Sequence, residues 1–174
     1  PDGKVTIEGS TVTGAARGTV TITATAAGSS KTTKLTVTGG TAGNWVYVDS
    51  HSGQIQYTGN WVDETSTNHY EGSAKEANDA PGATASLTFT GTGFRWIGQM
   101  DSNYGRAWIY VDDVLVAIGN ANSSTNPYQF TILELHGLEN KQHTVRLEAE
   151  SNAPVQVDAF AYYTGTDLDE TVSS

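Results

Sequence analysis

The chain has 174 residues and a formal net charge of −10, from nine Lys and Arg against nineteen Asp and Glu, and it has no Cys. Disulfides, thiolate metal sites and a Cys nucleophile are therefore excluded, and without a run of basic residues a nucleic acid is not an expected partner. No stretch of about 18 apolar residues is present, so we expect no membrane span. Charged residues make up only 16% of the chain, and Gly, Ser, Thr and Asn fill the polar positions, which predicts a β-rich protein with many turns.

The first 39 residues alternate between apolar side chains and Thr. Val20, Ile22 and Ala24 fall on one face of an extended segment, with Thr on the other face, which is typical of a strand with one solvated side. The strands predicted in this way are 4–7, 11–13, 18–25 and 34–38. Gly39-Gly40, followed by a segment without an apolar anchor, is the best linker candidate. We therefore place a domain boundary between residues 39 and 40.

This first segment resembles the C-terminal half of a bacterial Ig-like domain of group 2. The residues that carry the resemblance are 3–6 (Gly-Lys-Val-Thr), 18–24 (Gly-Thr-Val-Thr-Ile-Thr-Ala) and 31–38 (Lys-Thr-Thr-Lys-Leu-Thr-Val-Thr). The N-terminal strands of that family have no counterpart here. Either the chain is cut through the module, or its strands pair with a neighbour. Residues 1–39 are thus identified as a partial bacterial Ig-like domain.

Residues 40–174 contain many short strand-like runs separated by Gly and Asn turns. The clearest runs are 55–57, 85–90, 94–98, 107–111, 115–118, 130–135, 143–150 and 155–163. Apolar side chains alternate with polar ones along several of them and predict the core: Leu87, Phe89, Ile109, Val111, Val145, Leu147, Val155 and Val157. Short, regularly spaced strands without helical periodicity predict an all-β fold, an antiparallel β-sandwich or barrel.

The loop lengths give this second domain two different ends. Tight turns at 91–93, 112–113 and 137–141 alternate along the chain with long loops at 99–106, 119–128 and 151–154. Consecutive antiparallel strands put alternate connections at opposite ends, so the long loops are expected to gather at one end, together with 65–82. We call this end the rim. Variable loops on a rigid scaffold commonly carry function, so we expect the binding site there.

The second segment looks like a carbohydrate-binding module of the galactose-binding-domain-like, jelly-roll type, close to family 35. The matching residues are Tyr57-Thr-Gly-Asn-Trp61 and the segments 69–70, 81–98, 105–113, 143–147 and 157–160. The resemblance covers about 120 residues and assigns 40–174 to this β-sandwich. It implies a non-catalytic module of a secreted or cell-surface multidomain bacterial protein, whose partners are a polysaccharide or other glycan and further domains of the same polypeptide.

Candidate sugar-binding residues lie on the expected rim. Tyr104 sits in the middle of a long loop beside Gly105, from where it could stack on a sugar ring. Planar amide and guanidinium groups suit vicinal hydroxyls, although each such residue could equally be a turn residue. Trp61 could either stack on a sugar or pack in the framework. The remaining candidates are Asn103, Arg106, Asn120, Asn122, Asn126, Tyr128 and Asn152.

The resemblance also implies a structural Ca²⁺ between the first and the last strand of the module. It maps onto Asp49 and Asp158, with backbone carbonyls completing a shell of hard oxygen ligands. The four His residues show no short metal-binding spacing, so a zinc site is not expected.

Three classes of function can be compared on these features. A glycan-cleaving enzyme needs two carboxylates about 5–10 Å apart, and the rim offers only Asp101, Glu71, Glu76 and Asp79, with no spacing that singles out an acid and a base. No nucleophile elbow or nucleotide-binding motif is present either. The sequence therefore predicts a protein that is not an enzyme and that binds glycan through its rim. The alternative is a structural stalk or protein-adhesion module without a sugar ligand.

Overall fold

A computed structural model describes residues 43–165 with their side chains and, beyond these, only the backbone of five strands. The chain divides into two compact units, one of Asn44–Thr164 and one that combines Pro1–Gly43 with Gly165–Ser174. The five strands outside the range 43–165 belong to the latter unit: Val5–Glu8 (β1), Thr11–Gly14 (β2), Gly18–Ala26 (β3), Ser29–Gly39 (β4) and Leu168–Ser173 (β17). Among the described residues, no helix has the length and apolar character to cross a membrane.

In the first unit, the two ends of the chain share a sheet. β4 pairs antiparallel with β3 on one side and with β17 on the other, and β1 pairs with β2. The sequence-based division placed 165–174 in the second domain, and here the structure differs, because β17 occupies the free edge of β4, whose backbone groups would otherwise be unpaired. The resemblance of residues 1–39 to an Ig-like domain stays a prediction.

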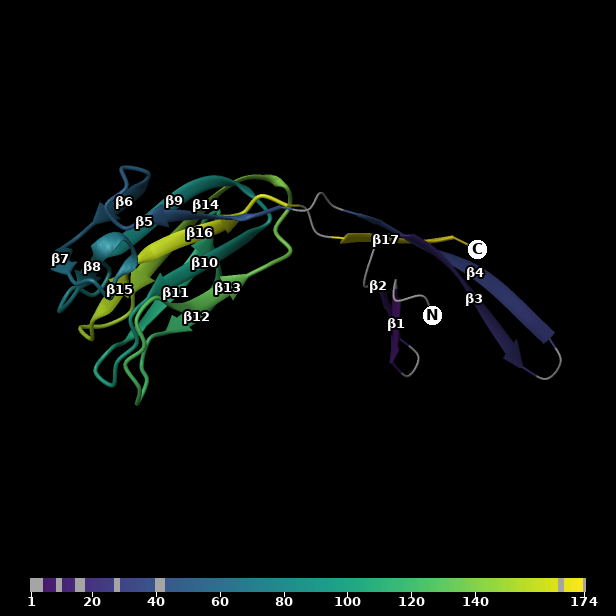
Figure 1. The fold of residues 1–174 in the computed structure, drawn as a ribbon, viewed down its shortest axis with the longest axis horizontal. Helices are drawn as coiled ribbons and strands as arrows, with labels where there is room; N and C mark the ends of the chain where they lie inside the picture. Colours follow the sequence, from purple (N-terminus) through teal and green to yellow (C-terminus); the bar gives the residue numbers. More distant parts are fainter. Residues whose placement is uncertain are drawn as a thin grey trace. The chain divides into compact units, whose positions relative to one another are not determined.

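The second unit is the all-β, antiparallel β-sandwich that the sequence predicts (Figure 1). One sheet has the order β13-β10-β16-β5, and the other has the order β12-β11-β14-β9-β6. The first comprises Phe130–Leu135 (β13), Gly93–Gly98 (β10), Ala159–Tyr163 (β16) and Trp45–Asp49 (β5). The second comprises Val114–Asn120 (β12), Arg106–Val111 (β11), Lys141–Ala149 (β14), Thr84–Gly91 (β9) and Ile55–Thr58 (β6). A small third sheet joins Val155–Val157 (β15), Ser73–Ala77 (β8) and Val62–Thr65 (β7). The short helix Tyr70–Gly72 (η1) lies in the connection between β7 and β8.

The core lies between the two large sheets. Trp96 of the four-stranded sheet is fully buried and donates a hydrogen bond from its Nε1 to the backbone oxygen of Gln156 at 2.8 Å. Gly119 of β12 faces this indole so closely that a Cβ there would lie 2.5 Å from the ring. The predicted core residues are all buried: Leu87, Phe89, Ile109, Val111, Val145, Leu147, Val155 and Val157. Period-two alternation therefore located the inner faces of the strands correctly.

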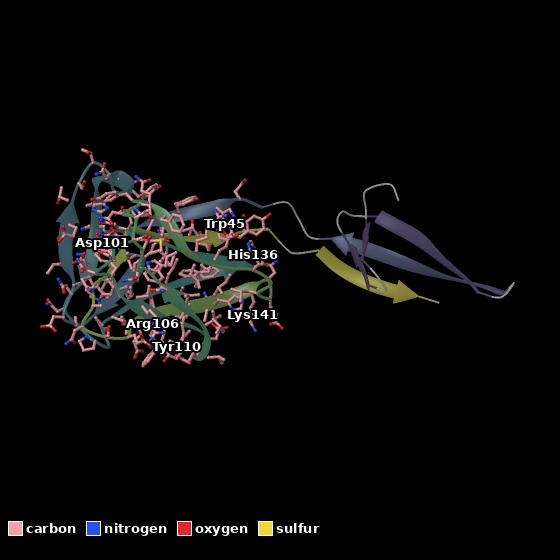
Figure 2. All side chains as sticks on the ribbon, turned by 90° about the horizontal axis from the view of Figure 1, so that it is seen from below. Trp45, Asp101, Arg106, Tyr110, His136 and Lys141 are labelled. Atoms are coloured by element: carbon pink, nitrogen blue, oxygen red, sulfur yellow. The ribbon has the colours of Figure 1, made fainter. Side chains whose placement is uncertain are left out.

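The two ends of the sandwich differ as expected from the loop lengths. Asn44 and Thr164, the first and last residues of the unit, hydrogen-bond to each other at the end that has the tight turns. Asp112 and Asp113 connect β11 to β12 there with φ of 51° and 66°, the left-handed values that a two-residue hairpin requires. Figure 2 shows Asp101 on the rim and Trp45 at the opposite end.

Candidate functional site

Three long loops meet on the rim and hold one another in place. The amide of Met100 donates to the oxygen of Pro127 at 3.0 Å, and that of Gly105 donates to Pro154 at 2.8 Å. Asp101 forms an isolated bridge with Asn122 and accepts a hydrogen bond from the amide of Ser123. The loops 99–105, 120–129 and 150–154 thus form one connected surface, as their positions along the chain indicate.

Tyr104 anchors this surface from below. Its hydroxyl donates to Oε2 of Glu76 at 2.7 Å, and its half-buried ring packs against the core. Burial raises the pKa of Tyr104 above its ordinary value, and the neighbouring carboxylate of Glu76 adds to the shift. Burial also raises the pKa of Glu76. A stacking role for Tyr104 assumed a ring that projects freely from the loop. The structure shows instead a ring that is packed against the core.

Other candidates on the rim also use their polar groups internally. The guanidinium of Arg106 binds both carboxylate oxygens of Glu150, at 2.7 and 2.9 Å. Asn122 donates from Nδ2 to the backbone oxygens of Ser102 and Tyr104, at 2.6 and 3.2 Å. These side chains hold loops together, because their strongest donors already have partners.

The remaining predicted residues are distributed around the same end. Trp61 is half-buried and donates from Nε1 to the backbone oxygen of Thr58, and the centroid of its ring lies 5.0 Å from that of Tyr57. These contacts are those of a framework residue. Tyr128 is 40% exposed, and its ring packs edge-on against His69. The others are exposed: Asn103, Asn120, Asn126 and Asn152.

A pocket of about 270 Å³ opens where the rim meets the outer face of the four-stranded sheet. Ile97 and Ala159 form an apolar floor from neighbouring strands, and the rings of Tyr47 and Tyr70 stack with their centroids 5.8 Å apart. The lining consists of Tyr47, Tyr70, Ile97, Gln129, Thr131 and Ala159. Aromatic rings beside an apolar floor, with an amide and hydroxyl groups at the edge, suit a small polar ligand that has an apolar face.

The walls of this pocket are held by specific contacts. The backbone amide of Tyr70 donates to Oδ1 of the fully buried Asp158 at 2.8 Å, and Gln129 donates from Nε2 to the oxygen of Asn68 at 2.9 Å. Gln129 and Glu71 both adopt a φ of 51°, a conformation that costs energy for residues other than Gly. The hydrogen bonds of Tyr70 and Gln129 hold the segments that contain these two residues in place.

Sequence reasoning named Tyr128 but missed its neighbour Gln129 and the two tyrosines of the pocket. Tyr47 lies in an edge strand where Trp45 and Tyr47 alternate with valines, a pattern that marks an outer face but not a site. Tyr70 belongs to the segment 69–70, which we used only for the resemblance to carbohydrate-binding modules. No local pattern links the two tyrosines, because Tyr47 lies in β5 and Tyr70 lies in η1, whose backbone is held by the distant Asp158.

The predicted calcium ligands lie beside the pocket. Asp49 Oδ2 and Asp158 Oδ2 are both buried without a hydrogen-bond partner, and the charge of Asp49 adds to burial in raising the pKa of Asp158 to about 6. Two unpaired carboxylate oxygens suit a hard cation such as Ca²⁺. Nδ1 of His69 is also unpaired, 3.8 Å from Asp158 Oδ2. Within residues 43–165, however, no three acidic or His side chains are grouped so as to hold a metal, so carbonyl or water oxygens would have to supply the other ligands.

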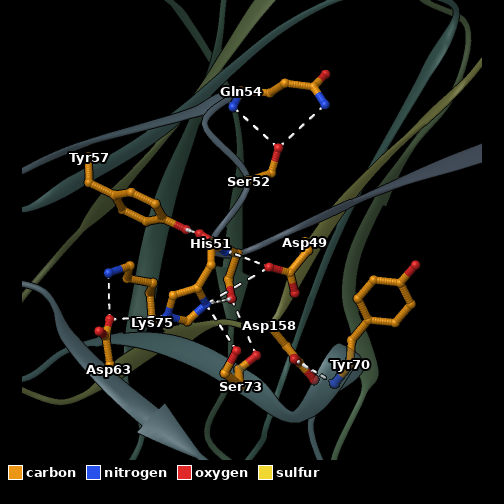
Figure 3. A network of polar contacts seen from close by, with 11 residues as sticks. Asp49, His51, Ser52, Gln54, Tyr57, Asp63, Tyr70, Ser73, Lys75 and Asp158 are labelled. Atoms are coloured by element: carbon orange, nitrogen blue, oxygen red, sulfur yellow. Dashed lines mark hydrogen bonds and ion pairs between the residues drawn. The ribbon is translucent and has the colours of Figure 1, made fainter.

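A polar network surrounds Asp49 on its other side (Figure 3). Asp49 Oδ1 accepts the amide of His51 at 2.7 Å, and the His51 ring bridges Ser50, Ser73 and Asp63. The Asp63 carboxylate also pairs with Lys75. This network ties the end of β5 to β7 and β8. It therefore also holds the connection between β7 and β8, which contains η1, beside β5.

Two known proteins are similar in sequence to this chain, whereas no protein family model matches it. An A type blood N-acetyl-alpha-D-galactosamine deacetylase of Flavonifractor plautii is 36% identical over 118 residues, which are 68% of this chain and 15% of that protein. An A type blood alpha-D-galactosamine galactosaminidase of the same organism is 34% identical over 119 residues, 68% of this chain and 11% of that protein. The chain thus spans only a small part of either relative.

A similarity in structure is found with a family 35 carbohydrate binding module from an environmental isolate. The TM-score is 0.56 and the sequence identity 14%, and the match covers 72% of this chain and 97% of that module. The chain therefore contains the β-sandwich fold of a carbohydrate-binding module.

Proposed function

We propose that the second unit is a non-catalytic module that binds glycan in the pocket beside the rim. The observation that carries this proposal is the pocket of stacked Tyr47 and Tyr70 over an apolar floor, with the amide of Gln129 and the hydroxyl of Thr131 at its edge. The C–H face of a sugar ring packs on aromatic surface, while its hydroxyl groups need hydrogen-bonding partners. Both relatives are named for enzymes of galactosamine sugars, which supports a glycan as the ligand.

The absence of catalysis is part of the proposal. Among the described residues, the six that line the pocket include no carboxylate, Ser or His that could act as nucleophile or general acid. Glu76 on the nearby rim is buried and bonded to Tyr104, which gives it a structural role. A module of this kind raises the local concentration of an attached enzyme on its substrate, so we also place it in a secreted or cell-surface multidomain protein.

We further propose that Asp49 and Asp158 hold a structural Ca²⁺. Their unpaired, buried oxygens would bind the ion, and the ion would offset the repulsion between the two carboxylates. Asp158 also holds the amide of Tyr70. The ion would therefore stabilise the wall of the pocket without contacting the sugar.

A glycan array probed with the whole chain, once with Ca²⁺ and once with chelator, tests these proposals. Specific binding that Tyr47→Ala weakens is expected, whereas binding to no glycan in either condition would favour the stalk or protein-adhesion alternative. The parallel melting experiment should show a higher melting temperature with Ca²⁺ for the natural chain and none of that increase for Asp158→Asn. A melting temperature that is the same with Ca²⁺ and with chelator would exclude the metal.

A further inference from the structure

We infer that the pocket binds one uncharged sugar residue at the end of a glycan chain and discriminates against residues that carry a carboxylate or an ammonium group. This inference rests on the proposed function and names the chemical class of its ligand. It follows from the size of the pocket, from the residues that line it, and from the state of the charged groups around it.

The size of the pocket favours a single ring. Its volume of about 270 Å³ is slightly below the range of roughly 300–1,000 Å³ that is typical for drug-sized ligands. A residue inside a chain has two glycosidic neighbours, and both rings would need room beside it. Tyr70 of η1 and Gln129, just before β13, line the pocket beside the strands that form its floor. The volume therefore matches a single ring, and we take that ring to be the terminal one, because an internal residue would need room for both of its neighbours.

The lining contains no group that could neutralise a charge. Its six residues include no Asp, Glu, Lys, Arg or His. They offer instead an amide oxygen on Gln129, whose Nε2 is already bonded to Asn68, and hydroxyl groups on Thr131 and the two tyrosines. These are partners for neutral hydroxyl or acetamido groups. A buried charge without a counter-charge loses the water around it and gains no equivalent interaction.

Two charged side chains that contact lining residues are already engaged. Arg95 stacks on the ring of Trp45 at 3.9 Å, pairs with Glu134 and donates to the hydroxyl of Tyr47 at 3.4 Å. Asp158, behind Tyr70, is fully buried and cannot contact a ligand in the pocket. A carboxylate sugar would meet the additional repulsion of a chain with a net charge of −10. Long-range attraction of an ammonium sugar is largely screened at physiological salt.

The relatives suggest the sugars for a sharp test. N-acetylgalactosamine and galactosamine differ by one acetyl group, which converts a cationic ammonium into a neutral amide. Competition by the methyl glycosides of galactose, N-acetylgalactosamine, galactosamine and galacturonic acid should be measured against the best array glycan at 150 mM salt, with the gluco series in parallel. In the series that binds, the neutral members should compete at least about tenfold better than the charged ones, equivalent to about 1.4 kcal/mol. Above the pH at which the amine loses its proton, galactosamine should approach the neutral sugars.

A charge introduced into the pocket gives a second readout. Gln129→Glu keeps the length of the side chain and should shift preference toward the ammonium sugar by about tenfold. Gln56→Glu is the matched control, because Gln56 lies exposed on the other sheet and likewise donates from its Nε2 to a backbone oxygen, that of Gly53 at 2.8 Å. Equal or tighter binding of a charged sugar by the natural chain, preference for internal chain segments, or equal shifts in both variants would overturn the inference while glycan binding stands. Failure to bind any glycan would overturn the proposed function itself.

Discussion

The tip of the rim and the pocket beside it use the same types of side chain in opposite ways. We call the surface of loops 99–105, 120–129 and 150–154 the tip. There, the hydroxyl of Tyr104, the guanidinium of Arg106 and the amide of Asn122 hydrogen-bond to Glu76, Glu150 and backbone carbonyls. In the pocket, Tyr47 is 45% exposed, and Gln129, which lines the same pocket, bonds to the backbone oxygen of Asn68 through its Nε2. From this comparison we propose that residue type and loop position alone do not identify a binding group, and that exposure and a free donor or acceptor are needed as well.

The largest effect is expected from Tyr104→Ala, which tests the structural role of the tip. The change removes a half-buried ring from the core and leaves the buried Glu76 carboxylate without its donor. Each consequence costs about 1–3 kcal/mol, so the melting temperature should fall by several degrees. Calorimetry and binding measured well below the melting temperature should show lower stability with unchanged glycan affinity.

Tyr104→Phe separates the two contributions to this loss. The variant keeps the ring and removes only the hydroxyl, so it should be intermediate between the natural chain and Tyr104→Ala in stability. If either variant retained its stability but lost its ligand, Tyr104 would be a binding residue, and the contrast between tip and pocket would be wrong.

Tyr47→Ala should produce the reverse pattern. The side chain lies on an outer sheet face, and its loss removes the stacking partner of Tyr70 from the pocket. We expect glycan affinity to fall at least tenfold, equivalent to about 1.4 kcal/mol, with the melting temperature within about two degrees of the natural value. Titration calorimetry beside a thermal melt measures both quantities.

Tyr110→Ala is the control for this change. Tyr110 lies on the outer face of the five-stranded sheet, with the guanidinium of Arg146 stacked over its ring at 4.0 Å, and none of the six residues that line the pocket belongs to that sheet. Affinity should therefore stay unchanged. A comparable loss of affinity in Tyr110→Ala would mean that the ligand binds to the five-stranded sheet, and our placement of the site would be wrong.

The fold was predictable because it depends on patterns that repeat. Alternation of Leu87 with Phe89 and of Val145 with Leu147 identified the inner faces, and the spacing of tight turns such as Asp112-Asp113 identified the two ends. The pairing of β17 with β4 was not predictable in this way. It joins segments about 130 residues apart, and no local period in the sequence reports on such a partner.

The site was less predictable than the fold for a related reason. The sequence indicates that Tyr104 and Arg106 are on the rim, but it does not show that Glu76 of β8 and Glu150, just after β14, bind them. The pocket depends on the same kind of long-range pairing. Tyr47 and Tyr70 become neighbours because Asp158, 88 residues further along the chain, holds the amide of Tyr70.

Glu76→Gln sharpens the comparison through pH. Burial raises the folded-state pKa of Glu76 above its ordinary value, so the folded protein binds this proton more tightly than the unfolded chain. The stability from this group is fully present below its unfolded pKa of about 4.3 and is lost as the pH rises through the higher folded value. Urea unfolding at pH 4 and pH 7 should show Glu76→Gln gaining stability relative to the natural chain at the higher pH. A difference independent of pH would contradict the assignment.

The smallest effect is expected from Arg106→Ala. The Arg106 side chain is 54% exposed, and although its geometry with Glu150 is bidentate, exposed ion pairs typically contribute about 0.2–1 kcal/mol. A double-mutant cycle with Glu150→Ala should give a coupling energy in that range, which decreases as salt is added because the pair is screened. Glycan affinity should not change in either variant, since Glu150 already occupies the two donors that a sugar would need. A selective loss of affinity in Arg106→Ala would mean that the ligand displaces Glu150, and the binding surface would then extend from the pocket onto the tip.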